Sequence, residues 1–172
     1  QDKVRAAREK SDHLGKVLGL LDSGDVEAAC DALQEAGDHR AAMLISQIGS
    51  GPNSQTSRLI QHQINRWREV QADRHIDADR LRLFSLVAGQ PVQNGNGEAV
   101  NTLAGLDWQR ALAHHLWYLG GPLASVPDTL SAYDGAWNAA EPYCSRPQPK
   151  YSEDTEGCLD DGQGAPLDIK YH

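Results

Sequence analysis

The feature that most constrains the fold is a pair of short amphipathic segments joined by a minimal turn. In DVEAACDALQEAG, apolar residues recur at i, i+3, i+4, i+7 and i+10 from Val26, and similar spacing returns in HRAAMLISQIG from Ala41. This period places apolar side chains on one face of a helix. Asp25 and Asp38 precede the segments as capping residues, and Gly37 offers the left-handed position at which a helix ends. The sequence therefore predicts an antiparallel helix hairpin.

Helical periodicity continues along most of the chain, and no segment shows a convincing strand pattern. Each helix of the hairpin occupies about 13 residues, whereas the next apolar stripe, through Ile60, Ile64 and Trp67, belongs to a segment of nearly 20. An array of identical tetratricopeptide or HEAT units is therefore disfavoured. We expect an all-α fold, an irregular α-solenoid of antiparallel helix pairs. Its further helices are expected at residues 1–21, 54–72, 79–88, 98–105, 107–119 and 127–140.

Composition excludes several classes of partner. The net charge of -8 and the isoelectric point near 5.2 argue against direct binding of nucleic acid, which depends on clustered Lys and Arg. No apolar run approaches the roughly 20 residues that a membrane helix needs, so we expect no membrane insertion. The three cysteines form no tightly spaced set, which favours a reducing compartment.

We divide the chain into three segments. Residues 1–140 carry the helical pattern. Residues 141–166 hold four prolines, three glycines and six acidic against two basic residues, and we expect them to form a long flexible loop. Residues 167–172 resemble the start of a further helix, and both ends of the chain look like cuts through a longer protein.

The stretch DWQRALAHHLWYL, residues 107–119, holds two of the four tryptophans in the chain. Asp107 is expected to cap a helix whose apolar residues lie on nearly all sides, as in a helix buried among others. Adjacent His114 and His115 point about 100° apart, whereas two ligands of one metal on a helix need a spacing such as i and i+4. We therefore expect both histidines to be hydrogen-bonded residues of the core.

No enzyme motif is visible, and we expect no catalytic, cofactor-binding or metal-binding residues. The chain lacks HExxH, GxxxxGK and GxSxG. The order Asp12-His13 and Asp38-His39 is the reverse of the His-Asp pair that helical metal-dependent phosphohydrolases need. Two alternatives to a scaffold stay open. One is a helical-repeat adaptor that binds peptides in a polar groove, and the other is a helical metallohydrolase, which would bind metal.

Three stretches follow one another between about residues 12 and 145: GDVEAACDALQEAGDHRAAMLISQIG, DADRLRLFSLVAGQPV and LDWQRALAHHLWYL. In this order and spacing they closely resemble the scaffold nucleoporin of the Y-shaped nuclear pore coat complex, which self-cleavage releases from a Phe-Gly-repeat precursor. The resemblance implies the ancestral coatomer element, an α-helical unit of crown, trunk and tail. This chain corresponds to the crown and adjoining helices.

The resemblance also implies a role, partners and a location. Proteins of this family are structural subunits of the nuclear pore complex in the nuclear envelope, where they support transport of protein and mRNA. They bind their stem neighbour, a nucleoporin of the same fold, crown to crown through apolar helix faces. The family's N-terminal strand segment, which completes a partner β-propeller, is missing from this chain, so we do not expect it to bind the propeller partner.

No motif maps the crown-to-crown contact onto individual residues of this chain. The helix at residues 79–88 has an unusually wide apolar arc. We expect the outer side of that helix to bind the partner, through Arg82, Leu83, Leu86 and Val87. The alternative left open is that these residues pack against another helix of the same chain.

Overall fold

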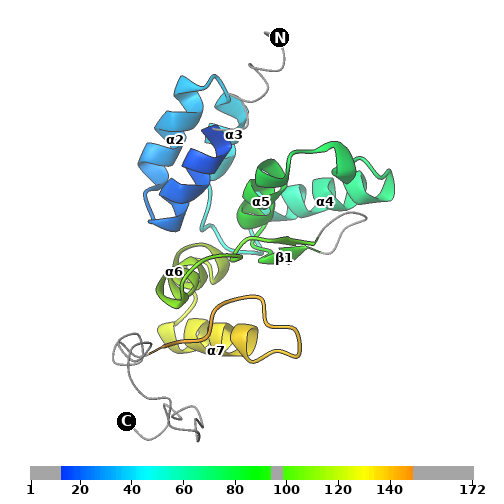
Figure 1. The fold of residues 1–172 in the computed structure, drawn as a ribbon. Coiled ribbons are helices and arrows are strands. Elements are labelled where there is room, and N and C mark those ends of the chain that lie inside the picture. Colours follow the sequence, from blue (N-terminus) through cyan, green and yellow to red (C-terminus); the bar gives the residue numbers. More distant parts are fainter. Residues whose placement is uncertain (1–12, 94–98, 149–172) are drawn as a thin grey trace, which may run out of the picture.

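The computed structural model describes residues 13–93 and 99–148, and within them the chain is mostly helical (Figure 1). Residues 13–22 are helical. They are followed by α2 (Val26–Glu35), α3 (His39–Ile45), α4 (Gln55–Glu69), the short 3-10 helix η1 (Asp73–His75) and α5 (Ala78–Val87). After two strands, β1 (Val92–Gln93) and β2 (Val100–Asn101), come α6 (Trp108–His114), the π-helix η2 (His115–Leu119) and α7 (Val126–Trp137). No helix in these described ranges is long and apolar enough to cross a membrane.

The expected helix hairpin is present as α2 and α3. The Asp25 carboxylate accepts a hydrogen bond from the Ala28 amide at 3.0 Å, and Asp38 accepts one from the Ala41 amide at 3.1 Å, so both predicted caps are confirmed. Gly37, between the helices, has a φ of 76°, the left-handed conformation that favours glycine. Buried alanines on both helices let the two axes approach closely.

Helices α4 and α5 form a second packed pair, connected through η1. Asp77 caps α5 by accepting hydrogen bonds from two amides of the first turn. Trp67 of α4 meets Phe84 of α5 edge to face, with the ring centroids 5.3 Å apart. An ion pair of 2.5 Å between Arg80 and Asp38 joins this pair to the hairpin.

The short helix expected at residues 98–105 is wrong for the described part of that range. There β2 pairs antiparallel with β1, and a turn follows. The Asn101 side chain accepts a hydrogen bond from the Leu103 amide at 2.9 Å. Such a side-chain bond gives the backbone an alternative to the helical pattern. The expected all-α fold is thus corrected to a mostly helical fold with a small two-stranded sheet.

Residues 141–148 run back from α7 without regular secondary structure, and hydrogen bonds hold them in place. The Tyr143 carbonyl accepts a bond from Asn101 Nδ2 at 2.8 Å, and the Ser145 carbonyl accepts one from the Tyr133 hydroxyl at 2.7 Å. The first part of the expected flexible loop is therefore attached to the fold.

The remainder of the expected loop, together with the expected helix start at 167–172, lies outside the described residues.

The buried apolar side chains gather in two cores. The larger core lies between residues 13–22 and helices α2 to α5, and Tyr118 of η2 reaches into it. The smaller core consists of Leu103, Leu106, Ala111 and Tyr133, from the turn after β2, α6 and α7. Figure 1 shows α6 lying between the N-terminal hairpin and α7. The segment α6–η2 therefore connects the two cores.

Candidate functional site

The segment from α6 to α7 changes helix type in the middle. Asp107 caps α6 as expected, because its carboxylate accepts a hydrogen bond from the Arg110 amide at 2.9 Å. After His114 the chain continues as the π-helix η2, which ends where the Gly120 amide donates to the His115 carbonyl at 3.0 Å. Short π-helical segments are rare in proteins, and those that occur often lie at functional sites. This segment is therefore a candidate functional site.

The histidine pair lies in the segment α6–η2, which connects the two cores and which we call the wall. His114 and His115 have only 1% and 4% of their surface exposed, which confirms that both are core residues. His114 Nε2 lies 3.0 Å from Asp22 Oδ1, and the two rings meet Tyr118 and Tyr133 edge to face. The expected hydrogen bonds are not found at His114 Nδ1, His114 Nε2 or His115 Nε2, which have no hydrogen-bond partner among the described residues.

Burial keeps the side chains of His115 and Tyr118 uncharged at neutral pH. Burial and then the neighbouring His114 lower the pKa of His115 to about 4. Burial and two nearby aspartates raise the pKa of Tyr118 to about 12, so its hydroxyl keeps the proton and donates to the Leu21 carbonyl at 2.9 Å. Within the described part of the chain, no three His, Cys, Asp or Glu side chains are placed to hold a metal ion. The histidine pair therefore supports packing.

Two turns of the chain lie directly against η2. A Cβ atom at Gly24 would come within 2.8 Å of the Trp117 ring, and one at Gly49 within 2.7 Å of the Trp117 carbonyl oxygen. Both glycines have positive φ angles, 82° and 80°. The larger core thus holds η2 in a fixed position. One edge of the Trp117 ring is packed, and 46% of the surface of Trp117 is exposed.

Exposed apolar side chains concentrate on η2 and α7. Leu123 is 97% exposed, Val126 61% and Leu130 47%. Val126 and Leu130 are four residues apart and lie on one side of α7, and Leu123 lies in the turn before this helix. We call these three residues the α7 stripe. With Leu116 and Trp117 of η2 they make five of the eight large apolar side chains that are exposed in the described ranges.

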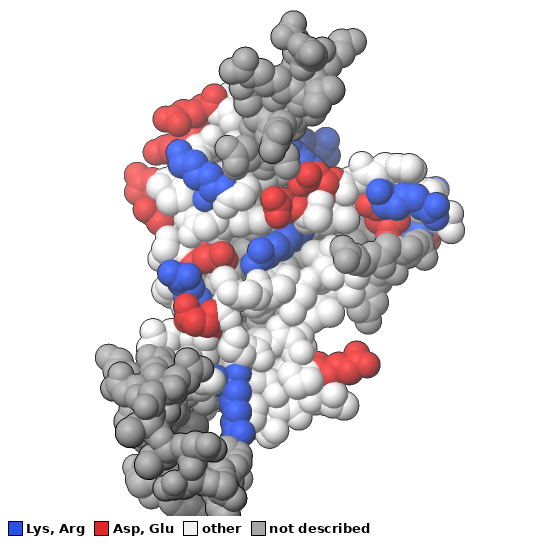
Figure 2. All heavy atoms as spheres, viewed as in Figure 1, with Lys and Arg blue, Asp and Glu red and all other residues white. Residues whose placement is uncertain are grey.

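The surface around the α7 stripe carries little charge. Residues 116–137 contain two charged residues, Asp128 and Asp134, and both are acidic. Figure 2 shows charged groups of both signs over the upper part of the molecule and at the level of α6, and fewer of them on the part of the lower end that is not grey, where α7 lies. An apolar strip of this kind suits contact with an apolar helix face of another protein.

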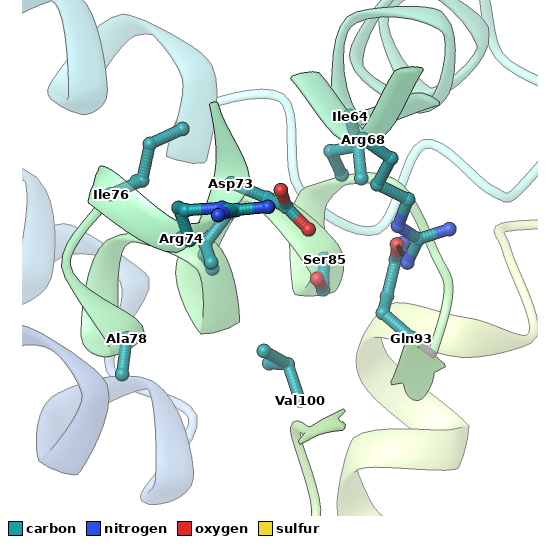
Figure 3. Close-up of a pocket in the computed structure, with 10 residues that line it drawn as sticks. Ile64, Arg68, Asp73, Arg74, Ile76, Ala78, Ser85, Gln93 and Val100 are labelled. Atoms are coloured by element: carbon teal, nitrogen blue, oxygen red, sulfur yellow. Dashed lines mark hydrogen bonds between the residues drawn. The ribbon is translucent and has the colours of Figure 1, made fainter. Parts of the chain in front are cut away.

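A pocket of about 260 Å³ lies between α4, η1, α5 and the two-stranded sheet (Figure 3). Its most buried lining side chains are Ile64, Asp73, Ser85 and Gln93. Toward solvent the lining continues with Arg68, Arg74, Ile76, Ala78, Leu81 and Val100. No sequence signal pointed to this pocket, because its residues come from separate elements and follow no motif.

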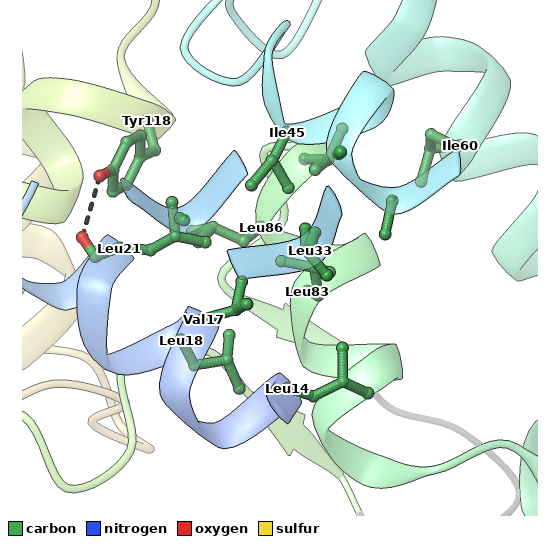
Figure 4. Packing of buried hydrophobic residues seen from close by; sticks show 14 of the residues in the cluster. Leu14, Val17, Leu18, Leu21, Leu33, Ile45, Ile60, Leu83, Leu86 and Tyr118 are labelled. Carbon is green, nitrogen blue, oxygen red and sulfur yellow. Dashed lines mark hydrogen bonds between the residues drawn. The ribbon is translucent and has the colours of Figure 1, made fainter. Parts of the chain in front are cut away.

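The residues expected to bind a partner lie within the fold. Leu83, Leu86 and Val87 are 3%, 2% and 7% exposed and belong to the larger core. Figure 4 shows Leu83 and Leu86 among side chains of the first helices. Arg82 donates through Nη2 to the Thr102 carbonyl at 3.0 Å. The expected partner-binding face of α5 is corrected to internal packing, because α4, β2, η2 and the first hairpin cover this helix.

The α7 stripe was missed by sequence reasoning. The pattern of the last helix groups Leu130 with Tyr133 and Trp137 on one face, but Tyr133 is buried whereas Leu130 is half exposed. Val126, Leu130 and Tyr133 fall within about 60° of one another on a helical wheel, so the sequence carries no signal that separates the two exposed residues from the buried one.

Comparison with known proteins gives a consistent family match. The model of the family Nup96, nuclear protein 96, matches residues 15–172. The chain is 32% identical over 160 residues to the nuclear pore complex protein Nup98-Nup96 of Drosophila melanogaster. The aligned region covers 93% of this chain and 8% of that protein.

Two further relatives extend the comparison to a fungus and a plant. The nucleoporin NUP145 of Chaetomium thermophilum is 30% identical over 128 residues, covering 68% of this chain and 7% of that protein. The nuclear pore complex protein NUP96 of Arabidopsis thaliana is 27% identical over 165 residues, covering 94% of this chain and 15% of that protein. The chain thus spans a small part of the length of each relative.

Proposed function

The chain belongs to the Nup96 family of nucleoporins, and on this basis we propose that it is a structural subunit of the nuclear pore coat that binds neighbouring nucleoporins through its helix faces. Its place is the nuclear pore complex in the nuclear envelope. Membership of this family agrees with a role that is not enzymatic. As a coat subunit, it would support the transport of protein and mRNA by holding its neighbours at fixed positions.

The observation that carries this proposal is that five of the eight exposed large apolar side chains of the described ranges belong to the α7 stripe and to η2. Apolar side chains that gather on a surface commonly mark a site of protein contact. Large side chains at the centre of such a patch contribute most of the binding free energy. Because the larger core already fixes η2, a partner meets an ordered surface, which lowers the entropic cost of association.

We propose that a helix face of the stem neighbour, a nucleoporin of the same fold, covers the α7 stripe in a crown-to-crown contact. The packed pairs α2–α3 and α4–α5 support a further proposal, that the chain is the crown portion of an irregular α-solenoid. In a solenoid, each helix pair packs mainly against its neighbours.

A peptide-binding adaptor is the alternative function, and the pocket bears on it. An adaptor needs a groove long enough to clamp an extended peptide. The pocket at η1 has a volume of about 260 Å³. Pockets that enclose a whole small molecule typically measure roughly 300 to 1,000 Å³. Since this pocket lies below that range, the scaffold function is favoured.

A double substitution in the stripe tests the proposed contact. In Val126→Glu/Leu130→Glu, two charges enter the apolar surface, and the affinity for the purified stem neighbour is expected to fall at least about tenfold. Both side chains are exposed, so the melting temperature should change little. Isothermal titration calorimetry and thermal melting on the same protein measure both quantities.

The matched control is Leu59→Glu/Val70→Glu, which changes two apolar residues of α4 that are 61% and 59% exposed. This control should bind like the unsubstituted chain. Unchanged binding by the stripe variant would refute the proposed surface, and loss of binding only in the control would place the contact on α4.

A further inference from the structure

The pocket between α4, η1, α5 and the two-stranded sheet has a polar inner end. Asp73, Ser85 and Gln93 are 8%, 2% and 4% exposed, and all three line it. The Arg68 guanidinium donates a hydrogen bond to Gln93 Oε1 at the same end. Figure 3 shows the Asp73 carboxylate and the Ser85 hydroxyl on the pocket side of their elements, with Arg68 and Gln93 beside them. A ligand that reaches this end meets hydrogen-bond donors and acceptors.

The outer part of the pocket is mainly apolar. Ile76, Leu81 and Val100 are half-buried lining residues, and Ala78 and Arg74 are exposed at the mouth. A group entering from solvent therefore passes aliphatic side chains before it reaches the polar end. This order suits a ligand with an apolar body and a polar tip.

The size of the pocket restricts the ligand further. Its volume of about 260 Å³ lies below the roughly 300 to 1,000 Å³ of a typical small-molecule site. A single large side chain of another protein fits this space better than a whole cofactor or metabolite does. Anchoring of one large side chain in a pocket is a common feature of protein interfaces.

Charge selects among the side chains that have an apolar body and a polar tip. The lining holds charges of both signs, Asp73 with Arg68 and Arg74, so the ammonium group of a lysine or the carboxylate of a glutamate would be attracted by one sign and repelled by the other. Either ion would also lose hydration. A tyrosine hydroxyl is neutral, can donate to the Asp73 carboxylate, and can accept from the Ser85 hydroxyl.

We infer that this pocket is a binding site for a tyrosine side chain presented by a protein partner. The ring packs between Ile76, Leu81 and Val100, and the hydroxyl reaches the polar end at Asp73 and Ser85. The site lies outside the α7 stripe, so it is independent of the proposed crown-to-crown contact. A tyrosine-bearing segment of a second partner is thus able to bind while the stripe is occupied.

The discriminating feature of such a site is rejection of phenylalanine. A site built to hydrogen-bond a hydroxyl loses affinity for an analogue that lacks it, because its buried polar groups are then left without that bond. An apolar pocket without this feature would bind phenylalanine equally well or better. The comparison of two probes that differ by one oxygen atom therefore tests the inference.

The experiment uses the full chain and two probes, N-acetyl-tyrosinamide and N-acetyl-phenylalaninamide. Nuclear magnetic resonance titration of the backbone amides of η1, α5 and β2 gives a dissociation constant for each. For the tyrosine probe we expect a value on the order of 1 mM, and for the phenylalanine probe a value about tenfold higher. Equal affinities, tighter binding of phenylalanine, or no saturable shifts with the tyrosine probe would overturn the inference.

Two variants locate the binding site. Ala78→Trp places a large side chain at the mouth, where Ala78 is exposed, and should abolish binding while the chain stays folded. Ser85→Ala removes the hydroxyl at the inner end and should reduce the preference for tyrosine over phenylalanine. The matched control, Ala132→Trp on the exposed side of α7, should bind the tyrosine probe normally. Normal binding by Ala78→Trp would contradict the proposed site.

Discussion

The two cores differ in how much apolar surface they enclose. Among the residues that the structure describes, the larger core contains seventeen buried apolar side chains, from residues 13–22, α2, α3, α4, α5 and η2. The smaller core contains four on the same basis, and half-buried side chains and hydrogen bonds from residues 143–145 complete its boundary. The region around the larger core therefore buries many apolar side chains, and the region around the smaller core buries few.

The difference explains where the exposed apolar residues lie. Helix α7 buries Thr129, Tyr133 and Ala136 against the smaller core and leaves the α7 stripe in solvent. Apolar burial contributes about 25 cal/mol per Å², so covering the stripe would stabilise an assembly that includes this helix. The larger core stabilises the fold of the chain, and the proposed partner contact would cover the stripe beside the smaller core.

The largest expected effect contrasts matched substitutions in the two regions. Leu86→Ala in the larger core, where the side chain is 2% exposed, should lower the free energy of unfolding by about 2 to 5 kcal/mol. Leu130→Ala in the stripe should change it by no more than about 0.5 kcal/mol. Chemical denaturation measures both values, and similar losses in the two variants would remove the distinction between the regions.

The wall between the cores should make stability depend on pH. The pKa of His115 falls from 6.5 to about 4 on folding, so between these values the unfolded chain binds more protons than the folded one. The contribution of neutral His115 to the free energy of unfolding is fully present above pH 6.5. It is lost as the pH falls toward 4, by up to about 3 kcal/mol.

Unfolding measured across this pH range checks the dependence, and His115→Gln is the control because it removes the titrating ring. The control should show a flatter profile than the unsubstituted chain. Identical profiles would show that His115 titrates normally in the folded state.

A smaller effect compares one tyrosine hydroxyl from each region. Tyr118→Phe removes the buried bond to the Leu21 carbonyl and should cost about 1 to 2 kcal/mol. Tyr133→Phe removes the part-buried bond to the Ser145 carbonyl and should cost about 0.5 kcal/mol, because water can replace the lost donor. Thermal melting of the two variants checks the order, and a larger loss for Tyr133→Phe would show that the smaller core is the better-ordered one.

Local features of the fold could be predicted from the sequence where a short-range signal sets them. Asp25, Asp38 and Asp107 each cap a helix as expected, because a cap depends on a side chain and an amide only three residues away. The strand at Val100 could not be predicted, because it forms only through pairing with β1, from which it is separated along the chain.

The functional surface could not be predicted because long-range packing decides it. The apolar residues of α5 and of α7 look alike in sequence. Leu86 is covered by helices that lie far away along the chain, whereas no other part of the described chain gives Leu130 comparable cover. Periodicity shows that a helix has an apolar side, and only the assembled fold shows whether the same chain covers it.

Amide hydrogen exchange, measured on the free chain and on its complex with the stem neighbour, tests the central claim most directly. In the free chain, we expect the amides of α2 and α5 to exchange slowly and those of α7 to exchange faster, because local stability follows the extent of burial. On binding, protection should increase in η2 and α7 and stay constant in α5. Binding that leaves α7 unchanged while protecting another helix would contradict the account.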